Sequence, residues 1–253
     1  MAHLLVNQTN GVTRITLDKP PLNVMDIELM RELSAALDAV RSNPAVKLVV
    51  IGAQGKLFSA GVDIREHTAE RVETMLHEFH AIFRRLGRLP QPTIAAVQGS
   101  ALGGGCELAM ACDFVIASTA AKFGQPEIQV GVFPPIAALL LPRLMPRKKA
   151  LEMILSGDSI DAQTAERFGL VNVAVPPEEF TATVDVFVAR FARLSGAVLR
   201  LAKRATLAAT QGKLESDLNA IEHLYLTELM QTADAREGLA AFMARRAPVW
   251  KDA

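Results

Sequence analysis

Several features that mark common protein classes are missing from this sequence. It has two cysteines, one tryptophan and one tyrosine in 253 residues, and its 27 basic and 27 acidic side chains leave no net charge. A protein that binds nucleic acid needs clustered lysine and arginine to neutralise phosphate, so the neutral composition argues against a nucleic-acid partner. Half of the residues are apolar and the mean hydropathy is +0.23, which excludes a disordered composition.

The cysteines and the apolar runs exclude further classes. Cys106 and Cys112 lie six positions apart in an apolar stretch without the cysteine and histidine spacing of a metal site, so we expect neither a disulfide nor a metal. The most apolar stretch, Ile136–Met145, is interrupted by Pro142 and Arg143 and falls short of the ~20 residues of a membrane span. The amino terminus lacks the pattern of a signal peptide. We therefore expect a cytoplasmic protein without a membrane partner.

Strand-like and helix-like patterns alternate along the first 125 residues. Alternating or continuous apolar runs predict strands, and apolar residues at helical spacing predict helices between them. The predicted strands are Val12–Leu17, Leu48–Ile51, Thr93–Val97 and Phe114–Ala117, and the predicted helices are one that begins at the N-cap Asp26, then Glu70–Leu89 and Gly103–Ala111. Strands separated by helices indicate an α/β fold with much parallel pairing.

The character of the chain changes after Leu144. Two short helices, Lys148–Leu155 and Ala162–Phe168, are each predicted to end at a glycine. Val171–Val175 is predicted as the last strand, and the chain from Glu178 onward has the pattern of helices.

One carboxyl-terminal helix is apolar on more than one face. Leu214, Leu218, Ile221, Tyr225 and Leu229 fall on one face, and Leu224, Leu226 and Met230 fall on others. A helix that is apolar nearly all round is buried on more than one side. Both a subunit interface and packing within the chain explain this pattern, and the sequence leaves the two open. After it, Asp234 and Glu237 resemble a capping box, which predicts a last helix that runs to Arg246.

A glycine-rich segment, Gly99–Glu107, carries the clearest chemical signal. Its three consecutive glycines, 103–105, begin a predicted helix and leave N–H groups unpaired at the start of that helix. Such groups, together with the helix dipole, hold an anion or a developing oxyanion, and Glu107 lies beside them in the first turn. A packing turn with a helix-stabilising glutamate explains the same pattern, so the residues alone leave both interpretations open.

Other catalytic motifs are absent around this segment. No lysine follows the glycines as in a Walker motif, and the spacing is not Gly-x-Gly-x-x-Gly. Ser59 and Ser100 lack the upstream glycine of a nucleophile elbow. His77 and His80 stand three positions apart, which is not the spacing of a helical zinc site, and we leave both out of the catalytic set.

Two further segments carry weaker signals. Lys56–Ile64 contains small residues after a predicted strand, which let backbone approach a ligand closely, although most such runs are turns. Ala121–Glu127 places a carboxylate directly after a turn proline. Nothing in the separation of 20 residues forces Glu107 and Glu127 together.

Taken in order, the three segments resemble the enoyl-CoA hydratase/isomerase (crotonase) superfamily. The matching blocks are Phe58–Asp63, Gly103–Ala109 and Phe123–Glu127, and the resemblance extends over essentially the whole chain. It implies an α/β fold, a crotonase-like spiral of ββα units with a C-terminal helical trimerisation region. Residues 1–195 would form the spiral core with the CoA and active site, and residues 196–253 the helical oligomerisation region. The implied assembly is a homotrimer or a hexamer made of two trimers.

The resemblance assigns four residues to the reaction. The backbone N–H groups of Val62 and Gly104 would form an oxyanion hole for the thioester carbonyl of an acyl-CoA. Glu107 would act as the base toward water, and Glu127 would supply the proton to the α-carbon. Adding water to a conjugated thioester needs all three functions, because the enolate charge must be stabilised, the attacking water must lose a proton and the α-carbon must gain one. No metal or separate cofactor is implied, since coenzyme A is part of the substrate.

The same resemblance implies a site for coenzyme A. The residues expected to contact it are Ala60, Val62, Asp63, Ile64, Arg65 and Gly104, together with Phe242 and Arg245 near the carboxyl terminus. Arg245 is equally explained as a solvated cation on a terminal helix.

Two departures from the family pattern bear on the substrate. Pro134–Leu140 replaces a segment in which the family usually has three glycines, and Pro20–Asn23 is one residue shorter than usual. With Ile221–Leu226 and Asp234–Leu239, these departures resemble one branch, the cyclohexa-1,5-diene-1-carbonyl-CoA hydratases. This adds a cyclic dienoyl thioester to the candidate substrates.

The predicted function is therefore that of an enoyl-CoA hydratase-type lyase. One alternative stays within the superfamily: an enoyl-CoA isomerase or another acyl-CoA enzyme of the same fold. The other belongs to a different class, a non-catalytic CoA- or RNA-binding protein. The presence of both glutamates and the neutral charge favour the hydratase.

Overall fold

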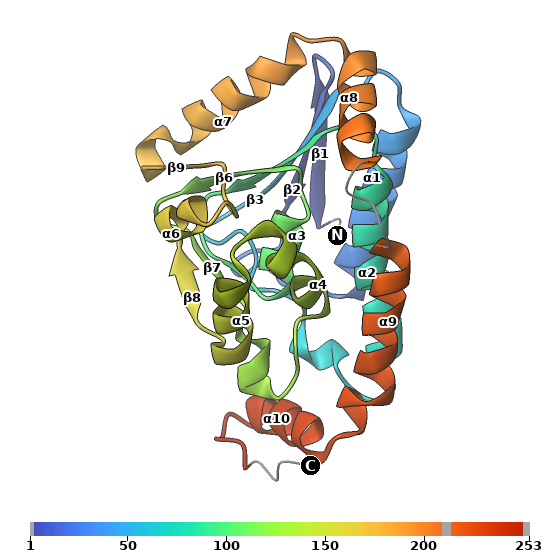
Figure 1. The fold of residues 1–253 in the computed structure, drawn as a ribbon, viewed down its shortest axis with the longest axis vertical. Helices are drawn as coiled ribbons and strands as arrows, with labels where there is room; N and C mark the ends of the chain where they lie inside the picture. The colour runs from blue at the N-terminus through green and yellow to red at the C-terminus, as the bar shows by residue number, and fades with distance from the viewer. Residues whose placement is uncertain (1–2, 209–213, 250–253) are drawn as a thin grey trace.

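The computed structural model describes residues 3–208 and 214–249 (Figure 1). Its main sheet has six strands in the order β1-β2-β3-β4-β6-β9. Their bounds are Leu4–Thr9, Val12–Leu17, Leu48–Ala53, Thr93–Val97, Phe114–Ser118 and Val173–Val175. β1 and β2 form an antiparallel pair, whereas all the later neighbours pair in parallel. The prediction of an α/β fold with much parallel pairing is confirmed.

The main sheet is buried on both faces, which explains why its strands have nearly continuous apolar runs. In β3, Val49 and Ile51 join the larger core, and Leu48 and Val50 belong to a second cluster on the other face. Helix α7 (Pro177–Ala192) packs on that second cluster and lies beside β6 and β9 in Figure 1.

Two long helices contribute buried apolar side chains to the larger core. α1 (Ile27–Ser42) begins at Asp26, whose side chain accepts a hydrogen bond from the backbone N–H of Leu29. This bond satisfies one of the unpaired donors at a helix start, and it confirms the predicted N-cap. α2 (Val72–Arg88) ends two residues before Pro90, as expected for a residue that cannot continue a helix.

A second, smaller sheet lies beside the main one. Its strands are β5 (Ala101–Leu102), β7 (Lys122–Gly124) and β8 (Ser159–Asp161). Two isolated bridges extend its pattern toward the amino terminus, since Met25 pairs with Val62 and Ser59 pairs with Ala101. Successive turns of the chain thus contribute a strand to the main sheet, a short extended segment to the second layer, and then a helix. This repeat is the spiral of ββα units that the resemblance implied.

Short helices follow the second layer and surround one end of it. They are η1 (Ile64–Glu66), α3 (Gly104–Met110), η2 (Pro126–Val130), α4 (Pro135–Leu144), α5 (Arg147–Ser156) and α6 (Ala162–Arg167). The predicted glycine ends of the last two are confirmed, because Gly157 and Gly169 have φ of +75° and +84° after them. The apolar stretch after Glu127 is helical, which the sequence pattern did not predict.

The chain ends in helices, as predicted. They are α8 (Gly196–Ala208), α9 (Leu214–Thr227), η3 (Leu229–Gln231) and α10 (Ala233–Met243). In Figure 1, α9 lies along α2, and α10 closes the lower end of the molecule. Leu218 and Tyr225 of α9 are buried within the same chain, so internal packing accounts for part of its apolar surface. The side chains of Leu214, Ile221 and Leu224 lie outside the described residues.

The capping-box prediction for the last helix is wrong. Thr232 is the N-cap, and its hydroxyl accepts a hydrogen bond from the backbone N–H of Ala235. Asp234 stands inside the first turn, and Glu237 pairs with Arg246. The helix begins two residues earlier than the capping box required, and it ends at Met243.

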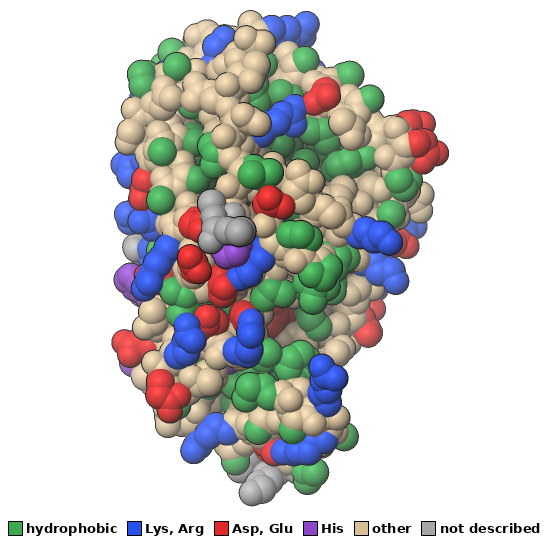
Figure 2. Space-filling view, turned by 180° about the vertical axis from the view of Figure 1, so that it is seen from behind, with side chains coloured by type: hydrophobic (Ala, Val, Ile, Leu, Met, Phe, Trp, Pro, Cys, Tyr) green, Lys and Arg blue, Asp and Glu red, His purple; other side chains and the backbone are tan. Residues whose placement is uncertain are grey.

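Figure 2 shows acidic and basic side chains interspersed over the face opposite to that of Figure 1. Among the described residues, no helix is long and apolar enough to cross a membrane. Within the same residues, no group of three or more histidine, cysteine, aspartate or glutamate side chains has the arrangement of a metal site.

Candidate active site

Two backbone N–H groups approach each other where α3 begins. Gly61 and Gly103 have positive φ values of +102° and +51°, which favour glycine. A Cβ atom placed on Gly61 would lie 3.3 Å from the amide nitrogen of Gly104, so the two chain segments are in close contact. Within the described residues, neither the N–H of Val62 nor that of Gly104 donates a hydrogen bond. The site therefore offers two neighbouring donors to a ligand.

Close packing fixes this arrangement. A Cβ atom on Gly104 would lie 2.8 Å from Val62 Cγ2 and 2.9 Å from Phe79 Cζ, so the position has room only for glycine. The Ser59 hydroxyl donates to the carbonyl oxygen of Asn23 at 2.8 Å and accepts from the N–H of Gly61 at 3.1 Å. Ser59 thus holds the turn before Val62, in agreement with its exclusion as a nucleophile.

Glu107 lies one turn into α3 and is buried, with 2% of its surface exposed. Its Oε1 accepts a hydrogen bond of 2.7 Å from the backbone N–H of Ala137, in the first turn of α4. Burial raises the pKa of Glu107 to about 7, against the opposing effect of the N–H groups of Ala137 and Ile136. The carboxyl group therefore exchanges its proton near neutral pH, as a general base requires.

Glu127 stands in η2, and its carboxylate lies against the glycine segment. A Cβ atom on Gly103 would come within 2.5 Å of Glu127 Oε1. Oε2 is buried and has no hydrogen-bond partner among the described residues. Burial, and then the negative charge of Glu107, raise the pKa of Glu127 well above its ordinary value. The surroundings of both glutamates thus favour the protonated form, and the charge on one raises the proton affinity of the other.

Strand pairing brings these two glutamates together. β5 pairs in parallel with β7, so that Leu102 stands opposite Gly124, and the N–H of Gly103 donates to the carbonyl oxygen of Gly124 at 2.9 Å. Glu107 and Glu127 each follow one of these two strands. The pairing therefore supplies the proximity that the 20-residue separation did not imply.

Both glutamates line one cavity of about 320 Å³. The predicted site residues that line it are Ala60, Val62, Ile64, Gly104, Glu107, Glu127 and Phe242. The rest of its wall is largely apolar and comes from α2, the segment around Phe133, and α9. This arrangement suits a mostly apolar ligand with one reactive polar group near the glycine segment.

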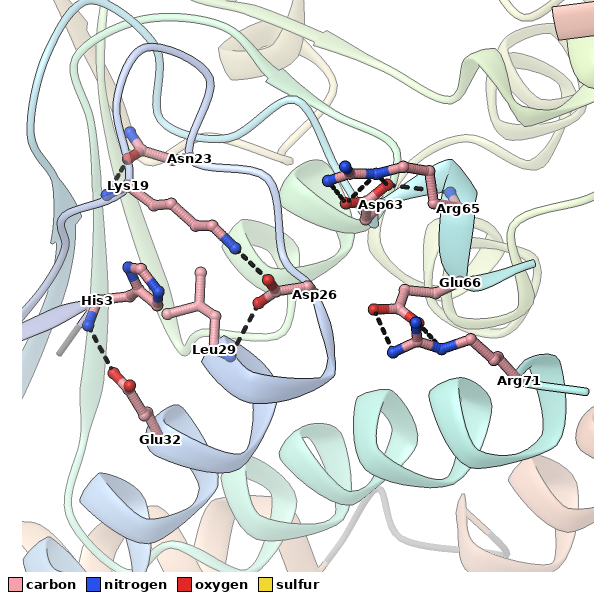
Figure 3. Close-up of polar contacts among 10 residues, drawn as sticks. All are labelled: His3, Lys19, Asn23, Asp26, Leu29, Glu32, Asp63, Arg65, Glu66 and Arg71. Carbon is pink, nitrogen blue, oxygen red and sulfur yellow. Dashed lines mark hydrogen bonds and ion pairs between the residues drawn. The ribbon is translucent and has the colours of Figure 1, made fainter. Parts of the chain in front are cut away.

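The remaining residues predicted to bind coenzyme A lie beside this cavity. A neighbouring cleft is lined by Ile64, Arg65, Phe242, Met243, Arg245 and Arg246, so it joins η1 to the end of α10. Asp63 lines neither the cavity nor the cleft. Instead its carboxylate pairs with Arg65 at 2.5 Å, as Figure 3 shows, and this bond lowers the pKa of Asp63. Asp63 therefore orients Arg65 and does not face the ligand space.

A second ion pair fixes the segment after η1. Arg71 contacts the buried carboxylate of Glu66 at 2.6 Å (Figure 3). Together with the Asp63–Arg65 pair, it holds the chain between the glycine turn and α2. His67 lies in this segment and lines the cavity, with Nδ1 3.3 Å from the carbonyl oxygen of Asp63.

His80 is fully buried between α2 and α9 and does not line the cavity. Its Nδ1 lies 3.5 Å from Glu222 Oε2 on α9, and Arg84 contacts the same oxygen at 2.9 Å. Burial lowers the pKa of His80, whereas contacts with His80 and Arg84 lower the pKa of Glu222 to about 2. This cluster joins two helices and takes no part in the cavity wall.

Sequence reasoning missed three polar residues of the cavity wall: His67, Gln129 and Tyr225. Tyr225 was interpreted only as part of an apolar helix face. Its status as the single tyrosine of a chain poor in aromatics was the one available signal.

A model of the enoyl-CoA hydratase/isomerase family matches residues 7–253. The chain belongs to this family. The cyclohexa-1,5-dienecarbonyl-CoA hydratase of Thauera aromatica is 36% identical over 247 residues, which cover 98% of this chain and 95% of that protein. The 2,3-dehydroadipyl-CoA hydratase of Escherichia coli (strain K12) is 34% identical and covers 99% of each chain.

Solved structures give the same result for the fold. The crystal structure of an enoyl-CoA hydratase from Mycobacterium avium subsp. paratuberculosis K-10 superposes with a TM-score of 0.89 at 32% identity, over 99% of both chains. The predicted crotonase family and its fold are thus confirmed. Family membership also confirms the prediction of an enzyme, a hydro-lyase of the enoyl-CoA hydratase type.

Proposed function

We propose that this enzyme adds water across the α,β-double bond of an acyl-CoA thioester, with Glu107 and Glu127 as its acid–base pair. The observation that carries the proposal is a single cavity in which two buried carboxyl groups lie beside two unpaired N–H donors. Hydration of a conjugated thioester needs donors for the carbonyl oxygen, a base for water and an acid for the α-carbon.

The oxyanion hole consists of the N–H groups of Val62 and Gly104. As water attacks the β-carbon, negative charge develops on the thioester oxygen, and donors fixed in advance stabilise it by several kcal/mol. The tight packing around Gly104 supports this role, because it keeps the donors in place without reorganisation during the reaction.

The glutamates divide the proton transfers between them. Glu107, with its pKa near 7, accepts a proton from the attacking water. Glu127, whose pKa is raised further above the ordinary value by the charge of Glu107, holds a proton and delivers it to the α-carbon. The product is the β-hydroxyacyl-CoA, and each glutamate returns to its starting state by proton exchange.

Coenzyme A is held along the mouth of the cavity. Ala60, Ile64 and the Val62 backbone line the passage, and Arg65 and Arg245 supply positive charge for its phosphates beside Phe242. Asp63 contributes by orienting Arg65. The reaction needs no metal or separate cofactor, because the thioester itself activates the double bond.

The proposed substrate is a cyclic dienoyl-CoA. The relative from Thauera aromatica, whose name specifies cyclohexa-1,5-dienecarbonyl-CoA, supports this choice. So does α4, which begins at Pro135 and puts bulky residues where the family has glycines. Pro135 and Phe133 line the cavity and narrow the space available to a flexible chain.

A loss-of-conjugation absorbance assay tests the function. Purified enzyme is compared on crotonyl-CoA and on cyclohexa-1,5-diene-1-carbonyl-CoA, with product analysis by mass spectrometry. We expect a mass gain of one water on both substrates and a higher kcat/KM on the cyclic one. Activity on crotonyl-CoA alone contradicts the cyclic substrate, and a product of unchanged mass indicates an isomerase.

A further inference from the structure

Tyr225 places a phenol in the wall of the cavity that holds the two glutamates. Its side chain is 1% exposed, and the residue lines the same cavity as Glu107 and Glu127. The ring is fixed by an edge contact with Phe133, with ring centroids 5.2 Å apart. A buried phenol in a fixed orientation is a polar group with a defined direction.

The hydroxyl of Tyr225 makes no hydrogen bond to another described residue, and it is not among the fully buried polar atoms of those residues, so it opens on the cavity. In the same cavity, Glu127 Oε2 is buried and also lacks a partner within those residues. Buried polar groups are almost always hydrogen-bonded in native proteins, because an unpaired one carries the full cost of desolvation. A phenol is a donor and a carboxylate oxygen is an acceptor, so each supplies what the other lacks.

The charge of Glu127 acts on the pKa of Tyr225. Burial raises the pKa of Tyr225, and the next cause is the negative charge of Glu127, followed by that of Glu107. The phenol therefore stays protonated throughout the working pH range and serves only as a neutral donor. His67 is the one basic side chain in the described wall, and the charge that acts on Glu127 is the negative charge of Glu107.

We propose that Tyr225 is a positioning residue that donates a hydrogen bond toward the Glu127 carboxyl group and sets the readiness of Glu127 to release its proton. A hydrogen bond to an ionised carboxylate is stronger than one to the neutral acid, so the phenol stabilises the form of Glu127 that follows proton delivery. The inference rests on the proposed function, in which Glu127 supplies the proton to the α-carbon.

Tyr225→Phe tests the proposal, because it removes the hydroxyl and keeps the ring against Phe133. Without the donor the pKa of Glu127 rises further, so the loss of activity at high pH, where Glu127 is ionised, moves upward by about one pH unit. We expect kcat to fall about tenfold with little change in KM. Ile64→Val is the control: Ile64 lines the same cavity from η1, so the change alters the wall without removing a donor or the ring on which Tyr225 packs. It is expected to change KM and to leave the high-pH loss of activity at its wild-type position.

A measurement without turnover separates this proposal from the proposed function. The carboxyl ¹³C resonance of Glu127, identified by its loss in Glu127→Gln, is titrated in the free protein with and without Tyr225→Phe. An upward shift of the Glu127 pKa supports the pairing even where wild-type enzyme hydrates no enoyl-CoA tested. Unchanged titration, or a variant that raises KM alone, shows that Tyr225 is only part of the wall and overturns the proposal.

Discussion

Glu107 and Glu127 show how a single residue acquires its chemistry from its surroundings. The sequence identified both through the family blocks, but their residue types alone were compatible with ordinary solvated carboxylates. Their proximity depends on the pairing of β5 with β7, two strands of two and three residues that have no periodicity to detect. The raised pKa values follow from burial in that joint cavity, a property of the fold that no local pattern encodes.

The buried charge of Glu107 predicts a conflict between stability and activity. The pKa rises from 4.5 to about 7 on folding, so keeping the group ionised costs stability progressively as pH rises between those values. Glu107→Gln is therefore expected to stabilise the fold by about 3 kcal/mol well above pH 7 and by nothing below pH 4.5. Urea unfolding at pH 4.5 and pH 8 measures this difference.

The exposed glutamate Glu152 on α5 provides the control for that measurement. It lies in a surface ion pair with Lys149, so Glu152→Gln is expected to change stability by less than about 0.5 kcal/mol at either pH. If Glu107→Gln stabilised the protein equally at both pH values, the ionised state of Glu107 would not be the cause.

At the scale of elements, most segments with clear apolar periodicity were predicted, whereas β1, α4 and the short strands of the second sheet were missed. The strands from Val12, Leu48, Thr93 and Phe114 and the helix capped by Asp26 all formed, because apolar periodicity over several residues signals them. β5, β7 and β8 were missed, since two or three residues carry no such signal. The capping box at Asp234 failed because Thr232, two residues earlier, offers its hydroxyl to the helix start.

The contact between α10 and η2 predicts an effect of a distant helix on the site. A Cβ atom on Gly238 of α10 would lie 2.2 Å from the carbonyl oxygen of Val130, in the short helix that carries Glu127. Gly238→Ala is expected to displace η2, destabilise the fold by about 1–3 kcal/mol and lower kcat. Thermal unfolding and steady-state kinetics measure the two effects.

Ala240 on the exposed side of the same helix gives the matched control. Ala240→Ser adds an atom to α10 away from η2 and should stay within about 0.5 kcal/mol of wild type. If the two variants lowered stability and kcat equally, any substitution in α10 would have this effect, and the contact between α10 and η2 would not be its cause.

At the scale of the whole molecule, the spiral fold and the assembly were predicted from the resemblance to the crotonase superfamily and not from residue patterns. The spiral of ββα units has no internal repeat in sequence, because its turns share geometry and differ in length. The division into residues 1–195 and 196–253 and the homotrimer or hexamer stay predictions. Exposed apolar side chains on the carboxyl-terminal helices, such as Val198, Leu201 and Met243, are consistent with such an assembly.

Sedimentation velocity tests that assembly. We expect a mass of three or six times the 27.3 kDa of one chain, unchanged by dilution in the micromolar range. A species of 27.3 kDa that retains full hydratase activity would show that neither the fold nor the site needs further copies.

The most direct test of the central claim is the hydration rate of Glu107→Gln and Glu127→Gln, measured together with their affinity for a saturated acyl-CoA. Both substitutions keep the volume of the side chain and remove proton transfer. We predict that each lowers kcat by about 10²–10⁴ while the acyl-CoA still binds with near wild-type affinity. Wild-type hydration rates in both variants would contradict the account.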